Sequence, residues 1–510
     1  MKITNLHPQA VWQRFYEITQ IPHPSGHTQA IADYVVNFGK KLGLETLRDE
    51  AGNVLIRKPK QAPLNSLSGG TLACTSTSAP EGELEGAGAI ILQAHLDMVP
   101  QKNSGVTHNF ETDPIETYIE GNLVKARNTT LGADNGIGMA LAMAVLQSTD
   151  IQHGNIEVLF TNDEETGMHG AFGLQKDWLK GDILINLDSE DEGELFIGCA
   201  GGIDVSVSLP YETEVAPENH TAFQLTLSGL RGGHSGCDIH LERANANKLI
   251  FKILKQATEK FDIRLVSADG GNLRNAIPRE ATAVVLVHND RVGEFRAFIS
   301  EMERLVRSEY EAIEENISMV VSRASTTGAV AEALEATNVL TAASQKQLID
   351  LICAFPNGVY RHIAQMPEVV ETSSNLAIVQ TTGNEAVLHC LLRSSVESRK
   401  AELCSEIESL ANLAGAKIEF SGGYPGWQPN FDSPILKTMT KTYEDLFGKT
   451  PQIKIIHAGL ECGIIGANYQ HLDMISVGPT VRFPHSPDEE LHIDTVERCW
   501  RFLVKTLETV

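Results

Sequence analysis

The chain has little of what builds a disulfide or cysteine–zinc scaffold. Its eight cysteines are scattered over 510 residues, and no two of them have Cys-x-x-Cys spacing. This pattern argues against a disulfide framework and against a structural zinc site made from paired cysteines. Reduced thiols in a cytoplasmic protein are the simplest account.

Long hydrophobic runs are also missing. The longest apolar stretches, such as Met139–Leu146, are far shorter than the ~20 residues that a membrane-spanning helix needs. Met1–Gln20 carries Lys2, His7 and Arg14, so it lacks the apolar core of a secretory signal peptide. We therefore expect a cytoplasmic protein that has no membrane partner.

Positive charge is scarce, because 41 lysines and arginines stand against 66 acidic residues, for a formal net charge of -25. This balance argues against nucleic acid or an anionic membrane as a partner. A few acidic ligands cannot account for it, so most of the acid belongs to a solvated surface. At 510 residues, the chain is too long for one ordinary core, and at least two domains are expected.

In the first 200 residues, apolar runs alternate with helix-like segments. Predicted strands are Ala89–Gln93, Ile156–Thr161 and Ile183–Leu187, and predicted helices are Gly136–Gln147 and Ala171–Leu179. Strands that alternate with helices predict an α/β domain whose mostly parallel sheet is flanked by helices.

The pattern changes after about residue 199. Ile203–Leu209 and Thr221–Leu227 alternate apolar and polar residues, which is typical of a half-buried antiparallel sheet. A second set of strands and helices with a similar layout follows, which suggests a duplicated α+β unit. From Ser433 the first pattern returns. We therefore predict an α/β domain of residues 1–201 and 427–510, interrupted by an inserted α+β domain of residues 202–426.

One segment of the first domain has an unusual composition. Residues 61–88 are rich in Gly, Ser, Thr, Pro and Ala and show little periodicity. They predict a surface loop inserted between two strands.

The sequence contains five acidic or imidazole clusters, and most of them follow predicted strands or open predicted helices. Ligands of a parallel sheet gather at the carboxyl ends of its strands. Nitrogen and oxygen donors without paired cysteines indicate a hydrolytic metal centre with two ions. The clusters are His95-Leu96-Asp97, Asp134-Asn135-Gly136, Glu164-Glu165, Asp188 and His485-Ser486-Pro487.

Each cluster alone also has an ordinary structural explanation. Asp134 can cap the helix that follows it. Glu164 and Glu165 can belong to a solvated acidic turn, Asp188 can be a turn residue, and His485 can be an exposed loop residue. The order and placement of all five clusters favour the metal centre.

The spacing within two clusters suggests roles. Asp97 lies two residues after His95, on the same side of an extended segment, and it can fix the tautomer of that imidazole. Glu164 and Glu165 point apart because they are successive residues. One of them can bind metal while the other accepts a proton from the attacking water.

Longer strings around these clusters carry a family resemblance. They are HLDM at 95–98, GADNGIG at 132–138, NDEETG at 162–167, NLDSE at 186–190, RGGHSG at 231–236 and PHSPDE at 484–489. With them, the chain resembles, over nearly its whole length, the zinc-dependent exopeptidases and deacylases that include aminoacylase, succinyl-diaminopimelate desuccinylase and the bacterial dipeptidases. The strings LGADNGIG, RNAIPRE and HAGLECG are most similar to the aminoacyl-histidine dipeptidases of that family.

This resemblance implies a role for each predicted ligand. Asp134 would bridge two divalent ions, and Glu164 would be the general base that later protonates the leaving amine. Asp97 would orient His95. Zinc is the implied metal, although manganese and cobalt suit the same donors. The remaining ligands would be His95 and Asp188 on one ion, and Glu165 and His485 on the other.

The resemblance also implies that the inserted domain is a lid and that the protein is a homodimer. His234 in RGGHSG would bring an imidazole to the oxyanion. Asn275 in RNAIP and Arg393 in LLRSS would bind polar groups of the substrate, and Arg393 suits a terminal carboxylate. Gly459 in HAGLECG would give a backbone donor near the substrate.

The expected function is that of a cytosolic metallo-dipeptidase. It would hydrolyse short peptides, preferentially Xaa-His dipeptides such as beta-alanyl-histidine. One alternative is an N-acyl amino acid deacylase or a carboxypeptidase with the same chemistry. The other is a catalytically inactive metal-binding scaffold.

Overall fold

The computed structural model describes residues 2–60, 89–324 and 338–510, so the predicted surface loop 61–88 lies outside the described residues. The chain divides into two compact units. Unit 1 comprises Met1–Gly198, Trp427–Ile455 and Leu460–Val510, and unit 2 comprises Cys199–Gly426 and Ile456–Gly459. The sequence-based division differs at two places, because it assigned both 199–201 and Ile456–Gly459 to the first domain.

Unit 1 is built on an eight-stranded sheet of order β1-β2-β6-β3-β7-β23-β8-β22. Its central pairs β6/β3, β3/β7 and β7/β23 are parallel, whereas β1/β2, β2/β6 and β23/β8 are antiparallel. The α/β prediction is thus confirmed, with a sheet that is parallel at its centre and antiparallel toward its edges. The strands are β1 Glu45–Arg48, β2 Val54–Lys58, β3 Ile90–His95, β6 Ile156–Thr161, β7 Ile183–Asn186, β8 Glu194–Cys199, β22 Gln452–Ile456 and β23 Asp473–Ser476.

Apolar sequence explains why this sheet lies inside the unit. Every residue of β3 and β6 is buried, as expected for strands covered on both faces. Helix α3 consists almost wholly of small and aliphatic residues, and it contacts both α1 and β3. The helices of unit 1 are α1 Gln9–Thr19, α2 Gln29–Lys41, α3 Ala133–Gln147, α4 His169–Gly173, α10 Pro434–Phe447, α11 Glu461–Asn468 and α12 Ile493–Thr509.

Helix α4 is shorter than predicted. The sequence predicts a helix over Ala171–Leu179, but α4 ends at Gly173. The Tyr469 hydroxyl accepts hydrogen bonds from the backbone N–H of Trp178 at 3.2 Å and of Leu179 at 3.4 Å. A distant side chain therefore satisfies donors that a continued helix would have satisfied locally.

A second, four-stranded sheet in unit 1 has the order β24-β25-β5-β4. It joins two hairpins that are far apart in the sequence, and the loop between β24 and β25 carries His485. Its strands are β4 Thr117–Glu120, β5 Leu123–Ala126, β24 Val481–Arg482 and β25 Glu490–His492.

Unit 2 is built on an antiparallel sheet of order β16-β11-β15-β13-β19-β20-β9-β21, with β18 paired to β19. Alternating burial along β11 shows that one face is covered, as the alternating sequence predicts. The predicted α+β insertion with an antiparallel sheet is confirmed. The strands are β9 Gly201–Pro210, β11 His220–Ser228, β13 Arg264–Gly270, β15 Ala281–His288, β16 Ser318–Arg323, β18 Gly358–Ile363, β19 Met366–Thr382, β20 Glu385–Ser394 and β21 Lys417–Tyr424.

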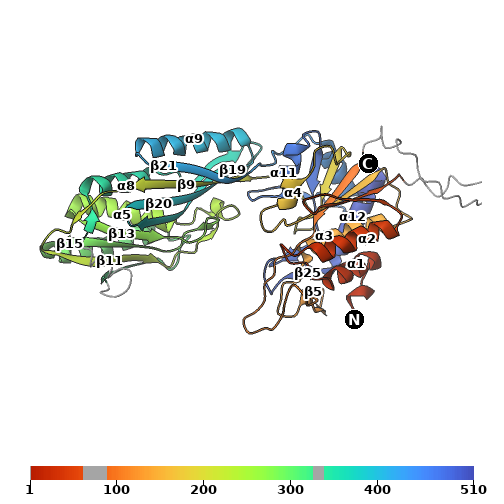
Figure 1. Ribbon diagram of the computed structural model, residues 1–510, viewed down its shortest axis with the longest axis horizontal. Coiled ribbons are helices and arrows are strands. Elements are labelled where there is room, and N and C mark those ends of the chain that lie inside the picture. The colour runs from red at the N-terminus through yellow and green to blue at the C-terminus, as the bar shows by residue number, and fades with distance from the viewer. Residues whose placement is uncertain (1, 61–88, 325–337) are drawn as a thin grey trace, which may run out of the picture. The chain divides into compact units, whose positions relative to one another are not determined.

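Two small sheets and four helices complete the described part of unit 2. The helices contact the large sheet, and α9 runs alongside β21 in Figure 1. The small sheets pair β10 with β17 and β12 with β14. These elements are β10 Thr213–Val215, β12 Gly233–His234, β14 Ala276–Ile277, β17 Asn338–Leu340, α5 Ala246–Phe261, α6 Val292–Glu309, α8 Ala342–Ala354 and α9 Glu397–Leu413.

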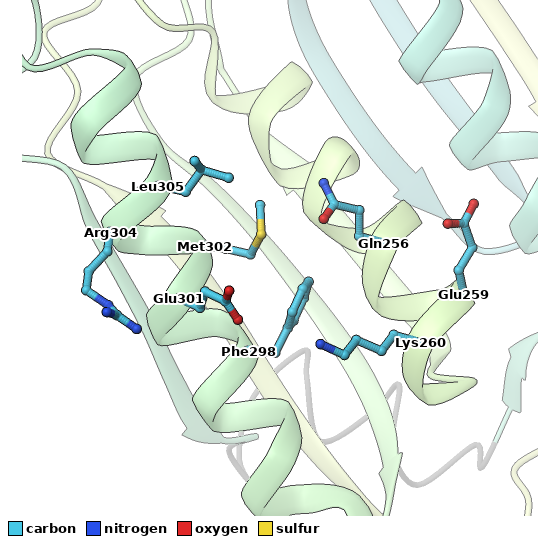
Figure 2. A pocket seen from close by; sticks show the side chains of 8 residues that line it. All are labelled: Gln256, Glu259, Lys260, Phe298, Glu301, Met302, Arg304 and Leu305. Atoms are coloured by element: carbon cyan, nitrogen blue, oxygen red, sulfur yellow. The ribbon is translucent and has the colours of Figure 1, made fainter.

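A cleft of about 700 Å³ lies between α5 and α6, and the side chains that line it are drawn in Figure 2. Lys260 lies over the Phe298 ring there, with Nζ 5.3 Å from the ring centroid. Its lining mixes two glutamates with a lysine and an arginine. None of the helices in the described ranges combines the length and apolar character needed to cross a membrane.

Candidate metal centre

The parallel strands of unit 1 bring three of the predicted clusters to one edge of the sheet. His95 is the last residue of β3 and pairs with Thr161, the last residue of β6. Glu164 follows three residues later. Asp188 lies two residues past the end of β7, which pairs with β3 on its other side. Parallel register therefore gathers these side chains at the carboxyl ends of neighbouring strands.

Asp134 faces two histidines at once. It lies in the first turn of α3, where Asp134 and Asn135 have non-helical backbone angles. Its Oδ1 is 3.0 Å from His95 Nε2, and its Oδ2 is 3.1 Å from His485 Nε2. Each carboxylate oxygen thus meets a different imidazole, which is the arrangement that a bridging ligand requires.

Each histidine also meets a second carboxylate. Asp188 Oδ1 is 3.4 Å from His95 Nε2, and Glu165 Oε1 is 2.9 Å from His485 Nε2. Donor atoms of three groups lie within 4.8 Å of one another: His95, Asp134 and Asp188; Asp134, Glu165 and His485; and His95, Glu164 and Glu165. The five predicted ligands therefore form two donor sets that share Asp134, and their chemistry fits two divalent ions.

Asp97 connects these donor sets to the backbone beside them. Its carboxylate accepts hydrogen bonds from the N–H of Glu164 at 2.9 Å and of Glu165 at 3.2 Å, and from Ser25 Oγ at 2.8 Å. Burial opposes the charged form, but the bonds from His95, Ser25 and the backbone outweigh it and lower the pKa of Asp97 to about 2.

Asp97 also contacts His95, the residue that it was predicted to orient, through its backbone carbonyl as well as its carboxylate. His95 Nδ1 is 3.0 Å from the Asp97 carbonyl oxygen and 3.4 Å from carboxylate Oδ1. The carbonyl oxygen can only accept, so Nδ1 carries a proton and Nε2 is left facing the acidic donors.

Burial and mutual repulsion make this acidic cluster unfavourable without cations. Burial raises the pKa of Glu164 well above its ordinary value, and the charges of Asp188, Glu461 and Glu165 add to the effect. Burial and the nearby charges of Asp134 and Glu165 likewise raise the pKa of Asp188 to about 6. Bound cations would remove this penalty, which supports the fit of the site to metal.

Glu461 is a buried carboxylate near the cluster that the sequence pattern did not indicate. Glu461 is the first residue of α11, and its Oε2 accepts from Gln93 Nε2 and from Thr161 Oγ1, both at 2.6 Å. Burial raises its pKa to about 7. The side-chain oxygen of Gln93 in turn accepts from Asn186 Nδ2. Asn186 Oδ1 accepts from the backbone N–H of Asp188 at 3.2 Å. The only signal in the sequence was an acidic residue opening an apolar helix.

In unit 2, the predicted oxyanion ligand His234 has a defined tautomer. Its Nδ1 accepts the backbone N–H of Gly236 at 3.2 Å and of Cys237 at 3.0 Å. Burial and the nearby Arg393 charge lower its pKa. The neutral imidazole therefore carries its proton on Nε2, as a donor to an oxyanion must.

Arg393 lies in β20 and is 5% exposed. Its Nη1 donates to Tyr424 Oη at 3.0 Å, and its Nη2 is 3.5 Å from His234 Nε2. Among the residues that the structure describes, no carboxylate pairs with this guanidinium. A buried, unpaired cation is costly, so a substrate carboxylate suits this position.

The other two predicted substrate residues also belong to unit 2. Asn275 precedes β14, and its carbonyl oxygen accepts the Ser235 N–H at 2.8 Å, which ties the RGGHSG and RNAIP strings together. Gly459 lies in the segment Ile456–Gly459 that is grouped with unit 2. The same segment contributes His457, which sequence analysis missed.

His457 predicts an acid-dependent loss of stability. Its Nε2 lies 2.7 Å from Ser373 Oγ, and burial with the charge of Arg393 lowers its pKa to about 3. The unfolded chain therefore binds more protons between about pH 6.5 and 3, and stability falls as the pH falls through this range. Between pH 7 and pH 5, we expect His457→Gln to lose about 2 kcal/mol less free energy of unfolding than the wild type.

Chemical unfolding followed at both pH values measures this difference, and comparing losses cancels the hydrogen bond to Ser373 that the substitution removes at either pH. His7→Gln, at a side chain that is 75% exposed, is the control and should follow the wild type. Equal losses of free energy of unfolding in the wild type and in His457→Gln would contradict the lowered pKa of His457.

Comparisons with known proteins bear on the whole chain. The family model described as Peptidase family M20/M25/M40 matches residues 91–509. The chain is 45% identical over 509 residues to the cytosol non-specific dipeptidase of Escherichia coli (strain K12), covering 100% of this chain and 99% of that protein.

Solved structures agree with this match. The aminoacylhistidine dipeptidase of Vibrio alginolyticus superposes with a TM-score of 0.87 at 44% identity, covering 100% of this chain and 98% of that chain. The aminopeptidase PepT of Bacillus cereus superposes with a TM-score of 0.56 at 13% identity, covering 99% of each chain, and shows a shared fold.

Proposed function

Because the chain belongs to peptidase family M20/M25/M40 and is a hydrolase of that family, we propose that it is a metal-dependent dipeptidase. Its preferred substrates are Xaa-His dipeptides such as beta-alanyl-histidine. The relative named as an aminoacylhistidine dipeptidase supports this preference, and the relative named as a cytosol non-specific dipeptidase supports the dipeptidase activity. The observation that carries the proposal is the sharing of Asp134 between two histidine–carboxylate donor sets.

We assign one divalent ion to each donor set. Zinc is the first choice, and manganese and cobalt are alternatives because they accept the same donor types. When bound, the ions would polarise the scissile carbonyl and lower the pKa of the attacking water. The ligands are His95, Asp134 and Asp188 for one ion, and Asp134, Glu165 and His485 for the other.

Glu164 is the general base. It takes a proton from the attacking water and later gives it to the leaving amine, as one carboxyl group can do in both half-steps. Its position supports this role, because a general base must lie close to the attacking water, and donor atoms of Glu164, His95 and Glu165 lie within 4.8 Å of one another. Asp97 holds the Glu164 backbone and thereby aims its side chain.

Unit 2 supplies the residues that hold the substrate. His234 donates from Nε2 to the developing oxyanion. Arg393, held by Tyr424, binds the terminal carboxylate and so restricts the enzyme to short peptides. Asn275 binds a polar group of the substrate, and Gly459 offers its backbone N–H. Unit 2 acts as the lid, whose closure would exclude water from the reaction.

The proposal extends to the state of the protein in the cell. We propose a cytoplasmic location, which the name of the Escherichia coli relative, a cytosol dipeptidase, supports. We also propose a homodimer, and light scattering in solution tests it through the particle mass.

A substrate panel tests the function. Xaa-His dipeptides, other dipeptides, tripeptides and N-acetyl amino acids are assayed with the metal-loaded protein. We expect the highest kcat/KM with Xaa-His dipeptides. A preference for N-acetyl amino acids would favour a deacylase, a preference for longer peptides would favour a carboxypeptidase, and inactivity toward all of them would favour an inactive scaffold.

Arg393 predicts how the substrate carboxylate contributes. Arg393→Met is expected to lower kcat/KM for a dipeptide with a free carboxylate by about 10²-fold, because a buried charge pair is lost. The same substitution should change little for the corresponding dipeptide amide. Arg291→Met, at a partly exposed arginine of unit 2, is the control. Equal losses for acid and amide would remove Arg393 from this role.

A further inference from the structure

Glu489, a buried carboxylate outside the predicted ligand set, accepts hydrogen bonds from the backbone of Asp134 and of the three residues before it. Glu489 is 2% exposed and accepts four backbone N–H groups. Its Oε2 accepts from Leu131 at 2.7 Å and from Gly132 at 3.0 Å. Its Oε1 accepts from Ala133 at 2.7 Å and from Asp134 at 3.3 Å. The last of these N–H groups belongs to the residue whose carboxylate faces both histidines.

The turn that offers these amides has a fixed shape. Gly132 has φ +71°, and a Cβ built there would lie 2.9 Å from Met98 Sδ. A side chain at this position would be strained, so the turn depends on glycine. Consecutive N–H groups that converge in this way make an anion site. Here the chain fills the site itself, with a residue that follows Asp134 by 355 positions.

The same carboxylate also belongs to the turn that carries the second histidine. His485 and Glu489 are four residues apart, and the Glu489 N–H donates to the Ser486 carbonyl oxygen at 3.0 Å. The Asp488 N–H donates to Ser486 Oγ at 3.1 Å, which tightens the turn further. Glu489 therefore links the turn of His485 to the turn of Asp134.

Only a carboxylate suits these four contacts. An ionised carboxyl group is an acceptor at both oxygens, whereas an amide side chain would direct two N–H donors at backbone donors. The choice has an electrostatic cost, because burial and the charge of Asp134 together raise the pKa of Glu489 to about 7. Retaining a second buried acid beside Asp134 is therefore explained by what it holds in place.

We propose that Glu489 is a positioning residue for the two-ion centre: it fixes the backbone of Leu131–Asp134 against the His485 turn. This sets the two Asp134 oxygens toward His95 and His485. Glu489 touches neither ion nor substrate in this account. The inference rests on the proposed function, since it concerns the affinity of the same metal centre.

The test compares metal affinity in three variants of the full chain. Outer groups that orient ligands typically contribute 10–100-fold to metal affinity. We expect Glu489→Gln to weaken zinc binding by about 10–100-fold in a competitive chelator titration. Glu489→Asp keeps the charge but is one methylene shorter, so its loss should be smaller. At saturating zinc, kcat for a dipeptide should be lowered while KM stays unchanged.

Glu157→Gln is the matched control. Glu157 is a buried carboxylate of unit 1 that accepts the N–H groups of Lys180 and Gly181 at 2.7 and 3.0 Å, and it lies near the start of β6 rather than at its carboxyl end. We expect it to lower the thermal midpoint and leave zinc affinity unchanged. A purely structural role for Glu489 would give the same result in Glu489→Gln.

The outcomes separate the two levels of the account. Wild-type zinc affinity in folded Glu489→Gln would overturn the positioning role while leaving the proposed function intact. If that variant does not fold, Glu489→Asp decides by the same measurement. Failure of the wild type to bind zinc at all would instead overturn the proposed function.

Discussion

Replacing Glu164 by glutamine is expected to lower kcat by about 10²–10⁴-fold while both metal ions stay bound. Glutamine keeps the shape of the side chain but cannot take a proton from the attacking water. Glu164 contributes to neither of the two donor sets that share Asp134. Hydrolysis rates together with elemental analysis of the dialysed protein measure both parts of this prediction.

Glu165→Gln provides the contrast at the adjacent position. Glu165 belongs to the same donor set as His485, so replacing Glu165 should weaken the binding of one ion and also lower the rate of hydrolysis. Normal turnover in Glu164→Gln would remove this residue from the role of base. Loss of both ions in that variant would show that it acts as a ligand instead.

Asp134→Ala is expected to abolish binding of both ions and to lower kcat/KM by on the order of 10³-fold or more, since the reaction depends on metal-activated water. The reason is geometric, because the two Asp134 oxygens face different histidines at 3.0 and 3.1 Å. Isothermal titration of the metal-free protein with zinc measures the number of ions bound.

His485→Ala serves as the comparison, because His485 is expected to bind one ion whereas Asp134 is expected to bind both. It removes one imidazole from the Asp134, Glu165 and His485 set, so the set of His95, Asp134 and Asp188 should still bind one ion. Two ions bound by Asp134→Ala would contradict the bridging assignment. If Asp134→Ala lost only one of the two ions, Asp134 would belong to one donor set and would not bridge them.

The strand-end part of the site follows from local sequence. Apolar runs that end in His95 and just before Glu164 and Asp188 predict buried parallel strands, and parallel register places their carboxyl ends together. His485 lies on a loop before the last helix rather than at a strand end, so its place in the cluster rested on the order of the motifs, and its pairing with Glu165 on one ion was implied by the family resemblance. The predicted surface loop 61–88 lies outside the described residues.

The contacts that support the site were not predictable in this way. Glu461 meets Gln93 across 368 positions and Glu489 meets Leu131 across 358, and neither glutamate belongs to a periodic pattern. Likewise, the hydroxyl of Tyr469, which is distant in sequence, accepts a backbone hydrogen bond from Trp178 in the segment after α4. Single buried polar residues give no local signal, because their partners are fixed only when the chain has folded.

The grouping of His457 and Gly459 with unit 2 has a similar cause. Both follow β22, a strand of the unit 1 sheet, so the sequence pattern assigned them to the first domain. Tertiary contacts such as that of His457 with Ser373 decide their place, and these contacts have no counterpart in composition or periodicity.

The central claim is that this chain is a dipeptidase whose activity depends on two ions sharing Asp134. Its most direct test is a zinc titration of the metal-free protein in which bound zinc and hydrolysis of beta-alanyl-histidine are followed together. The account predicts negligible hydrolysis without metal and maximal hydrolysis when two ions are bound. Hydrolysis by the metal-free protein, or binding of two ions without hydrolysis of any dipeptide, would contradict it.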